Sequence, residues 1–571
     1  MVSRGATNWP AIGVLLVALV LLAPLGALTV TAVTGFDAAA MAHLARTVLA
    51  ESVAVSVALA AGTLVGTVAI GVGAAWFVER YRFPGHASLA WMLVLPLAMP
   101  TYVIAYAYTD LLQFSGPVQR WLRDAFGFAG RLPDVRSLPG AIVLFSFVLY
   151  PYVYLMARTA LADVSRATID SARLLGRSGV RLFTQVVVPL IAPAVVAGAM
   201  LVLMETLADV GATQYFGLPT FSAGIYRAWF ALGNRSAALM LAVLLLVAIA
   251  VIFAVDHAAR GRAKRVTSRT HRPWPPTALS GAPALAMAAL MFTPVLLGFV
   301  LPCASLAWLL AGEPELTTNL ARFGQWTRNS FVAGVIGASV VLVLAVGFVY
   351  TERFAGARGH RLLTMAATGL RFGYAVPGAV IALAILWPVA TADRVLSDAL
   401  GLSSSLLTNS MLALGYAYTL RFFAVGYGGI EAAIERITPS LDAAARSLGA
   451  SRAAVFRRVH LPLLARPAMV AWMLVLIDVM KELPATLMLR PFNYDTLAVI
   501  AQQLAQDERL AEAALPSIAI VAIGVLPVIL VSRLMRGKPV AAGAGSRRRT
   551  VATDFARLAP DATPDALRSR P

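Results

Sequence analysis

The sequence predicts an all-α integral membrane protein with about twelve spanning helices, in two parallel repeats of about six helices each. The first observation is composition: 59% of the 571 residues are hydrophobic and 13% are charged, whereas soluble domains are about 45–50% apolar and about 25% charged. The mean hydropathy of +0.77 agrees with this. The second observation is an internal repeat, because a shift of 273 positions (449 − 176) places Gly176 on Gly449 and Ala172 on Ala445.

The spanning segments follow from bilayer thickness, because crossing about 30 Å of hydrocarbon takes about 20 apolar residues. The first apolar stretch, Ala11 to Val33, exceeds the about 7–15 residues of a signal-peptide core, so we expect an uncleaved first helix. The expected spans are 11–33, 50–77, 88–110, 140–160, 191–212, 236–256, 283–311, 329–350, 365–390, 408–429, 466–487 and 515–535. Pro100 and Pro377 lie within two of these spans and are expected to kink their helices rather than to contact substrate.

The net charge of +19 raises the possibility of a nucleic-acid partner. The basic residues, however, lie in short loops between apolar segments, as the positive-inside rule describes, so we expect a membrane-lipid partner and no nucleic acid. The single cysteine, Cys303, excludes an internal disulfide and a cysteine-based metal cluster. The chain also lacks a GxxxxGK[ST] phosphate-binding loop, and we expect no cofactor or firmly assigned metal.

Loop charge also predicts orientation. Most basic loops fall on one side if both termini are cytoplasmic. These loops are 79–86, 158–188, 261–276, 352–361, 431–466 and the segment after Arg533. The loop 111–139 is the exception, because it carries Arg120, Arg123, Arg131 and Arg136 yet must lie outside.

Four segments organise the chain. We expect a first membrane repeat at 1–260, a basic cytoplasmic linker at 261–277, a second membrane repeat at 278–537 and a disordered tail at 538–571. An even number of helices in each half gives both halves the same orientation.

Two polar stretches, 170–179 and 443–452, are copies of one loop. Each is expected to form a short helix, a glycine break and a second short helix. Thr438 can cap the first helix of the second copy, with Pro439 at its first position. Thr168 is expected to do the same in the first copy.

The middle of each loop explains the break. Gly176 and Gly449 suit the left-handed conformation that ends a helix. The following helix is expected to be capped by Ser178 or Ser451 and to stop at Pro189 or Pro462. Arg173 and Arg446 lie one turn before the glycine, where they can meet an acidic surface of a partner. The alternative is a plain solvated connector, which the matched copies disfavour.

These residues resemble a known motif. The spacing Ala-x3-Gly-x12-Pro is similar to the EAA loop of permease subunits in binding-protein-dependent ABC importers. Asp170 departs mildly from the leading glutamate of that motif, and Ala443 departs fully. The resemblance implies that the loops contact an ATPase through Asp170, Ala172, Arg173, Gly176, Pro189, Ala445, Arg446, Gly449 and Pro462.

Nearly the whole chain, except the linker and the tail, resembles the ferric-iron importer permeases, in which two permease halves are fused. The stretches 204–229 and 478–499 carry this resemblance. It implies a multi-pass inner-membrane subunit that is not itself an enzyme. A cytoplasmic ATPase dimer binds the ATP, and a periplasmic binding protein delivers the cargo. Thiamine permeases share the fused layout, and an ATP-independent secondary transporter is the alternative class.

Acidic residues repeat within the membrane as well. Glu205 corresponds to Asp478, and Asp209 corresponds to Glu482, in the fifth span of each half. The two carboxylates of each half are four residues apart and are expected to share one helix face. A carboxylate costs about 2.5–3.5 kcal/mol in the middle of a spanning helix, so such residues face a cavity or a partner. One hypothesis is that all four line the substrate pathway, with Lys481 partly neutralising their negative charge. The alternative is a set of structural polar pairs, including Asp478 with Lys481.

Overall fold

The computed structural model describes residues 9–34, 42, 45–127, 130–263, 274–312, 316–355, 357–401, 407–408 and 410–535. The expected tail at 538–571 and most of the linker lie outside these ranges. The described residues are largely helical. Their strands are β1 (Tyr81–Arg82) and β2 (Thr277–Ala278), which pair in parallel with Tyr81 opposite Thr277.

The first half consists mainly of helices. They are α1 (Trp9–Thr34), α3 (Ala50–Arg80), α4 (His86–Met92), α5 (Thr101–Leu112), α6 (Pro117–Phe126), α7 (Leu138–Ala162), α8 (Arg166–Leu174), α9 (Gly179–Leu182), α10 (Val188–Ala208), α11 (Gly211–Tyr215), α12 (Phe221–Tyr226) and α13 (Arg235–Ala263).

The second half repeats this order. Its helices are α14 (Ala282–Val295), α15 (Leu301–Ala311), α16 (Leu316–Arg353), α17 (Ala357–Ala375), α18 (Gly378–Leu400), α19 (Met411–Ile434), α20 (Pro439–Ser447), α21 (Arg452–Val455), α22 (Leu461–Lys481), α23 (Pro484–Leu489), α24 (Leu497–Gln506) and α25 (Leu510–Met535).

Ten of the described helical segments are long and apolar enough to cross a membrane, or eleven if one bent pair is counted as a span. The all-α membrane fold is therefore confirmed. The predicted span 408–429 corresponds to α19, which is not among these ten segments. Helix α19 is less apolar than they are because it contains Arg421 together with several tyrosines and glycines.

Two other expected spans are broken. The segment 88–110 is bent by 94° where α5 begins after Pro100. The segment 365–390 is divided into α17 and α18 before Gly378, at Pro377. Both prolines hold an extended backbone, because the pyrrolidine ring cannot continue the preceding helix. The expectation that these prolines kink their spans is confirmed, but each break is complete.

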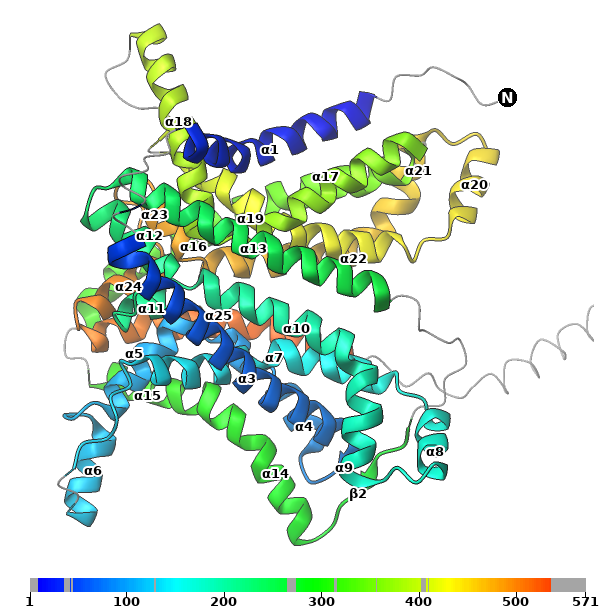
Figure 1. Ribbon diagram of the computed structural model, residues 1–571. Coiled ribbons are helices and arrows are strands. Elements are labelled where there is room, and N and C mark those ends of the chain that lie inside the picture. The colour runs from blue at the N-terminus through cyan, green and yellow to red at the C-terminus, as the bar shows by residue number, and fades with distance from the viewer. Residues whose placement is uncertain are drawn as a thin grey trace, which may run out of the picture. The chain divides into compact units, whose positions relative to one another are not determined.

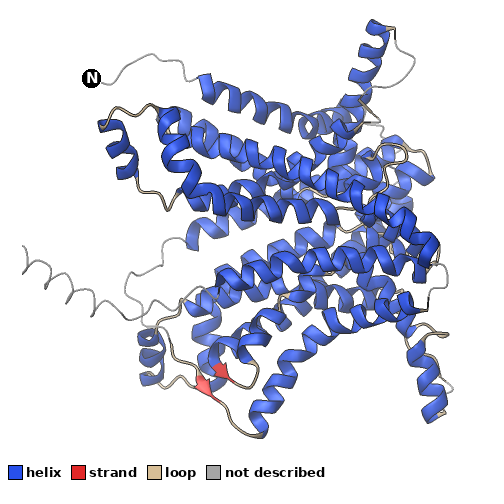
Figure 2. Cartoon of the chain, turned by 180° about the vertical axis from the view of Figure 1, so that it is seen from behind, coloured by secondary structure: helices blue, strands red, loops and turns tan. Residues whose placement is uncertain are grey.

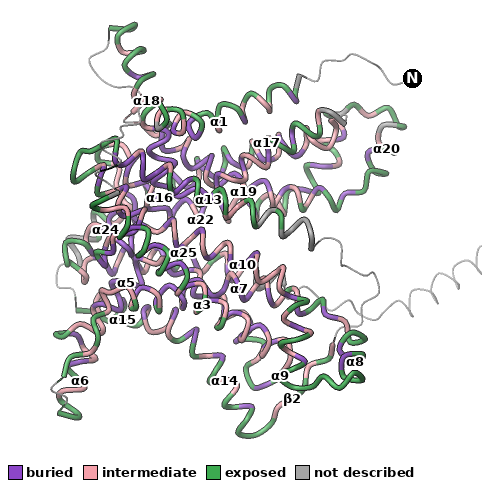
Figure 3. Tube along the Cα trace, in the orientation of Figure 1, coloured by how far each residue is buried: buried purple, intermediate pink, exposed green. Residues whose placement is uncertain are grey.

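The first span of each half packs against helices of the other half. Helix α1 packs against α17 and α18 of the second half, while α14 and α15 pack against α4 and α5 of the first half (Figure 1). One apolar core accordingly joins Leu21 and Leu25 to Leu370 and Ile381, all nearly inaccessible to solvent. Figure 3 shows buried residues concentrated where the helices of the two halves meet.

Helices α8 and α20 lie at the same end of the spanning helices, and α6 lies at the opposite end (Figures 1 and 2). The two loops that repeat in the sequence are therefore presented on one side. Gly176 and Gly449 adopt φ values of +78° and +81°, so the predicted left-handed breaks are confirmed.

Candidate functional site

Each repeated loop forms a helical hook, defined here as α8 with α9 in the first half and α20 with α21 in the second. Helix α20 begins at Pro439, as expected. Helix α8, however, begins one turn earlier than expected. Ser165 is its N-cap and accepts a hydrogen bond from the Thr168 amide at 3.1 Å. The prediction of Thr168 as the cap is wrong, because Ser165 supplies the same hydroxyl three residues earlier.

The expected helix stops at Pro189 and Pro462 are also wrong. The chain passes through a π-helical turn in each half, Phe183–Val187 and Phe456–His460, and continues directly into α10 and α22. Each proline closely follows this π-helical turn, and such a local π adjustment lets a helix continue past a proline that lacks the N–H. The hooks are thus rigidly continuous with the fifth spans.

The hook tips expose apolar side chains. Leu174 and Leu175 are 89% and 81% exposed, and Leu448, which corresponds to Leu175, is 88% exposed. Ala172 is buried. Asp170 pairs with Arg166 at 3.2 Å on the hook surface. The side chain of Arg446 lies outside the described residues.

The second hook is fastened by a buried ionic network (the Asp442 network). Arg353 Nε lies 2.8 Å from Asp442, and the same guanidinium donates to the carbonyls of Ile434 and Ile437. His460 Nε2 lies 2.6 Å from the other Asp442 oxygen. Burial raises the pKa of the Asp442 carboxyl, but the hydrogen bonds from Arg353 and His460 outweigh burial and leave this pKa below its usual value.

The first hook is fastened differently. Positions 169 and 187, which correspond to Asp442 and His460, are the buried apolar residues Ile169 and Val187. Trp274 from the linker takes the place of the ionic network. The Arg80 guanidinium lies 4.3 Å from the Trp274 ring centroid and that of Arg173 lies 5.6 Å away. Arg80 also donates to the Pro275 carbonyl at 3.0 Å. The end of the linker therefore packs against the first hook and the adjacent end of α3.

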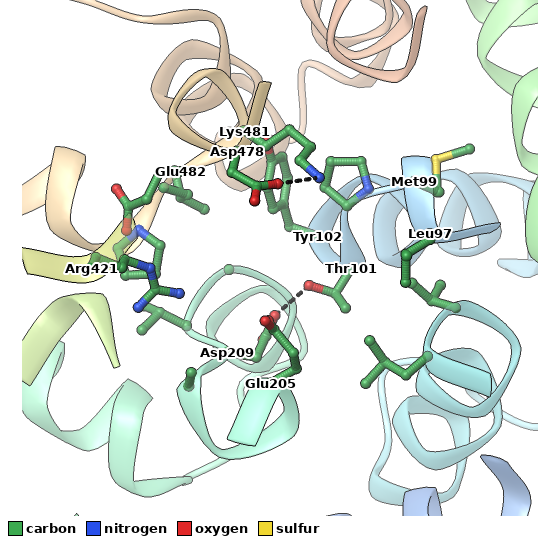
Figure 4. A pocket seen from close by; sticks show the side chains of 18 of the residues that line it. Leu97, Met99, Thr101, Tyr102, Glu205, Asp209, Arg421, Asp478, Lys481 and Glu482 are labelled. Carbon is green, nitrogen blue, oxygen red and sulfur yellow. Dashed lines mark hydrogen bonds and ion pairs between the residues drawn. The ribbon is translucent and has the colours of Figure 1, made fainter. Parts of the chain in front are cut away.

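A central cavity of about 170 Å³ lies between the halves, within the bundle (Figure 4). It is lined by matched positions from both halves, including Glu205 with Asp478 and Asp209 with Glu482. All four predicted carboxylates and Lys481 therefore line one cavity. Whether this cavity carries substrate stays a prediction.

Two of these carboxylates are not placed as expected. Asp209 and Glu482 were expected to share a helix face with Glu205 and Asp478, but α10 and α22 end just before them. Each turns back onto the short helix that follows. Asp209 accepts a bond from the Thr213 amide at 2.9 Å and another from the Thr101 hydroxyl. Glu482 accepts bonds from two amides, at 2.9 Å each, at the start of α23. Both act as caps.

The other two carboxylates remain on the spans and face the cavity (Figure 4). Asp478 forms the anticipated ion pair with Lys481 at 3.2 Å. Figure 4 shows Glu205 on the opposite wall, beside Asp209.

Sequence reasoning missed Arg421, which points into the same space from α19. Its Nη1 donates to the Val376 carbonyl at 2.9 Å. The signal was available, because an arginine inside an apolar span usually faces a cavity. The cavity therefore holds two acidic and two basic side chains besides the two capping carboxylates. Among the described residues, no group of three His, Cys, Asp or Glu side chains is arranged to hold a metal ion.

Comparison with known proteins matches residues 67–265 and 353–537 to the family described as "Binding-protein-dependent transport system inner membrane component". The chain is 25% identical over 500 residues to the Fe(3+)-transport system permease protein FbpB 2 of Haemophilus influenzae, covering 86% of this chain and 91% of that protein. It is 28% identical over 166 residues to the molybdenum transport system permease protein ModB of Escherichia coli, covering 29% of this chain and 71% of that protein. The sulfate transport system permease protein CysW of Escherichia coli is 27% identical over 203 residues, covering 36% of this chain and 68% of its own length.

Proposed function

Because this chain belongs to the family of binding-protein-dependent transport system inner membrane components, we propose that both hooks of this ABC importer permease receive the motion of a cytoplasmic ATPase dimer. The observation that carries the proposal is the presentation of α8 and α20 at one end of the spans. The chain is a multi-pass inner-membrane protein, and this end faces the cytoplasm in our proposal.

The ATPase dimer contacts the exposed hook tips. Leu175 and Leu448 are large, apolar and almost fully exposed at matched positions. Exposed apolar side chains of this kind are suited to the apolar core of a protein–protein interface. ATP is bound by that partner, which performs the hydrolysis, and this chain needs no cofactor of its own.

The hooks can transmit motion because each is continuous with a fifth span. Helices α10 and α22 continue from the hooks through one π-helical turn each, and their far ends, Ala208 and Lys481, line the central cavity. A displacement of the hook therefore moves a cavity wall. Alternating access then follows from rigid-body motion of the two halves about the cavity.

The cargo arrives from a periplasmic binding protein at the end opposite the hooks. Ferric iron is the leading cargo, supported by the iron permease relative that aligns over 91% of its length. Glu205 and Asp478 supply carboxylate oxygens, the ligand type that hard cations prefer. Their partial neutralisation by Arg421 and Lys481 permits release, because a cavity that binds too tightly cannot transport.

An oxyanion is the second candidate cargo. Arg421 and Lys481 both line the cavity, and the molybdenum and sulfate permeases are also relatives. Thiamine is a third small-solute candidate. Uptake of labelled ferric iron, molybdate, sulfate and thiamine into proteoliposomes, each with its binding protein, distinguishes them.

The coupling proposal is tested by Gly176→Val with Gly449→Val in the reconstituted ATPase complex. An added Cβ atom meets nothing within 4 Å at either position, but the positive φ values disfavour a β-branched side chain there. The matched control is Gly127→Val, since Gly127 has φ +62° with open space around it and lies at the end of α6. We expect ATP-driven uptake to fall about tenfold, or ~1.4 kcal/mol, in the hook variant alone.

Two results would contradict the proposal. Unchanged coupling between ATP hydrolysis and uptake in the hook variant would remove the hooks from the mechanism. Transport by the purified chain without ATPase or ATP, driven by an ion gradient, would establish the alternative of a secondary transporter.

A further inference from the structure

Helix α6 is amphipathic. Its apolar residues Val118, Trp121, Leu122 and Ala125 follow the i, i+3, i+4, i+7 spacing of one helix face. Arg120, Arg123 and Asp124 fall on the other side. The helix follows Gly116 and ends at the left-handed Gly127.

The apolar face of α6 is open. Trp121 is 58% exposed and Phe126 is 70% exposed. Their rings form an edge-to-face pair with centroids 5.2 Å apart. The helix is held to the protein through Gln119 instead, which is 2% exposed and donates to the Leu112 carbonyl at 2.8 Å. Two large aromatic side chains are thus held together on a face that the described protein leaves exposed.

The position of α6 limits what can cover this face. Only a few residues separate it from the end of α5 at Leu112, and α7 begins soon after it at Leu138. Figures 1 and 2 show α6 leaving the bundle at the end opposite the hooks and running across the direction of the spans. A helix that extends sideways at the end of a span is continuous with the lipid-facing surface.

We infer that α6 lies in the membrane interface, with Trp121 and Phe126 buried at the boundary of the acyl chains and headgroups. Tryptophan is enriched at this depth, and short amphipathic helices with basic polar faces bind there. Arg120 and Arg123 face the lipid phosphates, which provide the opposite charge.

This placement accounts for three of the four arginines that break the charge pattern of the other loops, namely Arg120, Arg123 and Arg131, whereas Arg136 pairs with Glu508 at 3.1 Å. Arg123 and Arg131 lie with their guanidinium carbons 4.7 Å and 5.0 Å from the Phe114 ring centroid. Phe114 is itself 51% exposed. Guanidinium groups above an aromatic ring at the headgroup level can contact phosphates while the ring remains in the apolar layer.

The second half contains a segment that corresponds to α6. Shifting α6 by 273 positions gives 390–399, which lies in the last part of α18. That part also projects from the bundle at the end opposite the hooks (Figure 3). Val395 and Leu400 are 66% and 59% exposed there. Both halves therefore carry an exposed apolar helix surface at the same level.

The inference is tested with spin labels in the full chain. Cys303 is the single native cysteine, so Cys303→Ser gives a clean background. Ala125→Cys places a label on the apolar face, and the adjacent Asp124→Cys places the matched control on the polar face. Both sites are exposed. The protein is reconstituted in vesicles of phosphatidylethanolamine and phosphatidylglycerol.

We expect the Ala125→Cys label to show a several-fold higher ratio of oxygen to nickel-chelate accessibility than the Asp124→Cys label. Equal access of the water-soluble nickel chelate to both labels would overturn the inference. Protection of Ala125→Cys that begins only when the periplasmic binding protein is added would also overturn it, because the face would then be a protein-docking surface.

Discussion

Arg421 of α19 and Val148 of α7 occupy corresponding positions in the two halves (421 − 273 = 148), and both line the central cavity. Lys481 likewise corresponds to Ala208. Both basic side chains of the cavity therefore come from the second half, although the acidic positions are matched. The duplicated bundle has become electrically asymmetric where substrate is expected to pass.

The first prediction concerns this asymmetry. Arg421→Gln should reduce uptake about tenfold, because Asp478 keeps its ion pair with Lys481 while the Glu205 carboxylate loses the compensating charge in the cavity. Combining it with Glu205→Gln should restore part of the uptake, since the charge is rebalanced. Val148→Ala is the control, as it changes the corresponding wall without changing charge. Initial uptake rates at matched protein levels provide the measurement, and a double variant no better than the single variant would contradict the prediction.

The second prediction separates the two kinds of carboxylate. Asp209→Ala and Glu482→Ala should lower the thermal unfolding midpoint, because losing a helix cap costs about 0.5–2 kcal/mol. Glu205→Gln and Asp478→Asn should leave the midpoint nearly unchanged while reducing uptake. Thermal unfolding in detergent, followed by uptake assays, distinguishes the pairs. Equal destabilisation by all four substitutions would assign all four to structure.

Much of the fold could be predicted from the sequence because the duplication fixes corresponding positions. The matched glycines correctly indicated two hooks, and Pro100 and Pro377 correctly indicated kinks, although the structure has complete breaks there. The packing of α1 against the second half, and of α14 and α15 against the first half, could not be predicted. Apolar periodicity does not say which helices a span packs against.

The candidate site was only partly predictable. The spacing of Glu205 and Asp209 suggested one helix face, but the helix ends between them and Asp209 bonds to backbone amides instead. The end of α10 depends on this local competition, which spacing alone does not reveal. Arg421 was visible in the sequence, but its direction is fixed only by the packing of α19.

The third prediction concerns the Asp442 network. Asp442→Ile alone should destabilise the protein by about 3 kcal/mol, because His460 and Arg353 lose their buried acceptor. Adding His460→Val should recover part of this loss, since the pair then matches Ile169 and Val187 in the first half. A double variant that loses as much as the sum of the single variants would contradict this interpretation.

The lowered pKa of Asp442 predicts how the difference in stability between the wild type and Asp442→Ile changes with pH. A carboxylate whose folded-state pKa is depressed stabilises the protein fully above its unfolded pKa, about 3.9. That stabilisation is lost as pH falls through the folded-state pKa. The difference in unfolding midpoint between the wild type and Asp442→Ile should therefore persist from neutral pH to mild acid and shrink only in strong acid.

The fourth prediction concerns the linker. Trp274→Ala should loosen the first hook, because Arg80 and Arg173 lose the ring they share. Hydrogen exchange of the α8 amides should accelerate, while exchange in α20 stays unchanged as the internal control. Equal acceleration in both hooks, or none in α8, would show that Trp274 does not hold the first hook.

The fifth and most direct test asks whether both hooks contact one motor. Photo-reactive probes are attached at Leu175→Cys or Leu448→Cys in the Cys303→Ser background, with Val65→Cys, an exposed span position, as the control. We predict cross-links to the ATPase subunit from both hook positions and none from Val65→Cys. Failure of both hook positions to cross-link in an assembled, ATP-hydrolysing complex would contradict it.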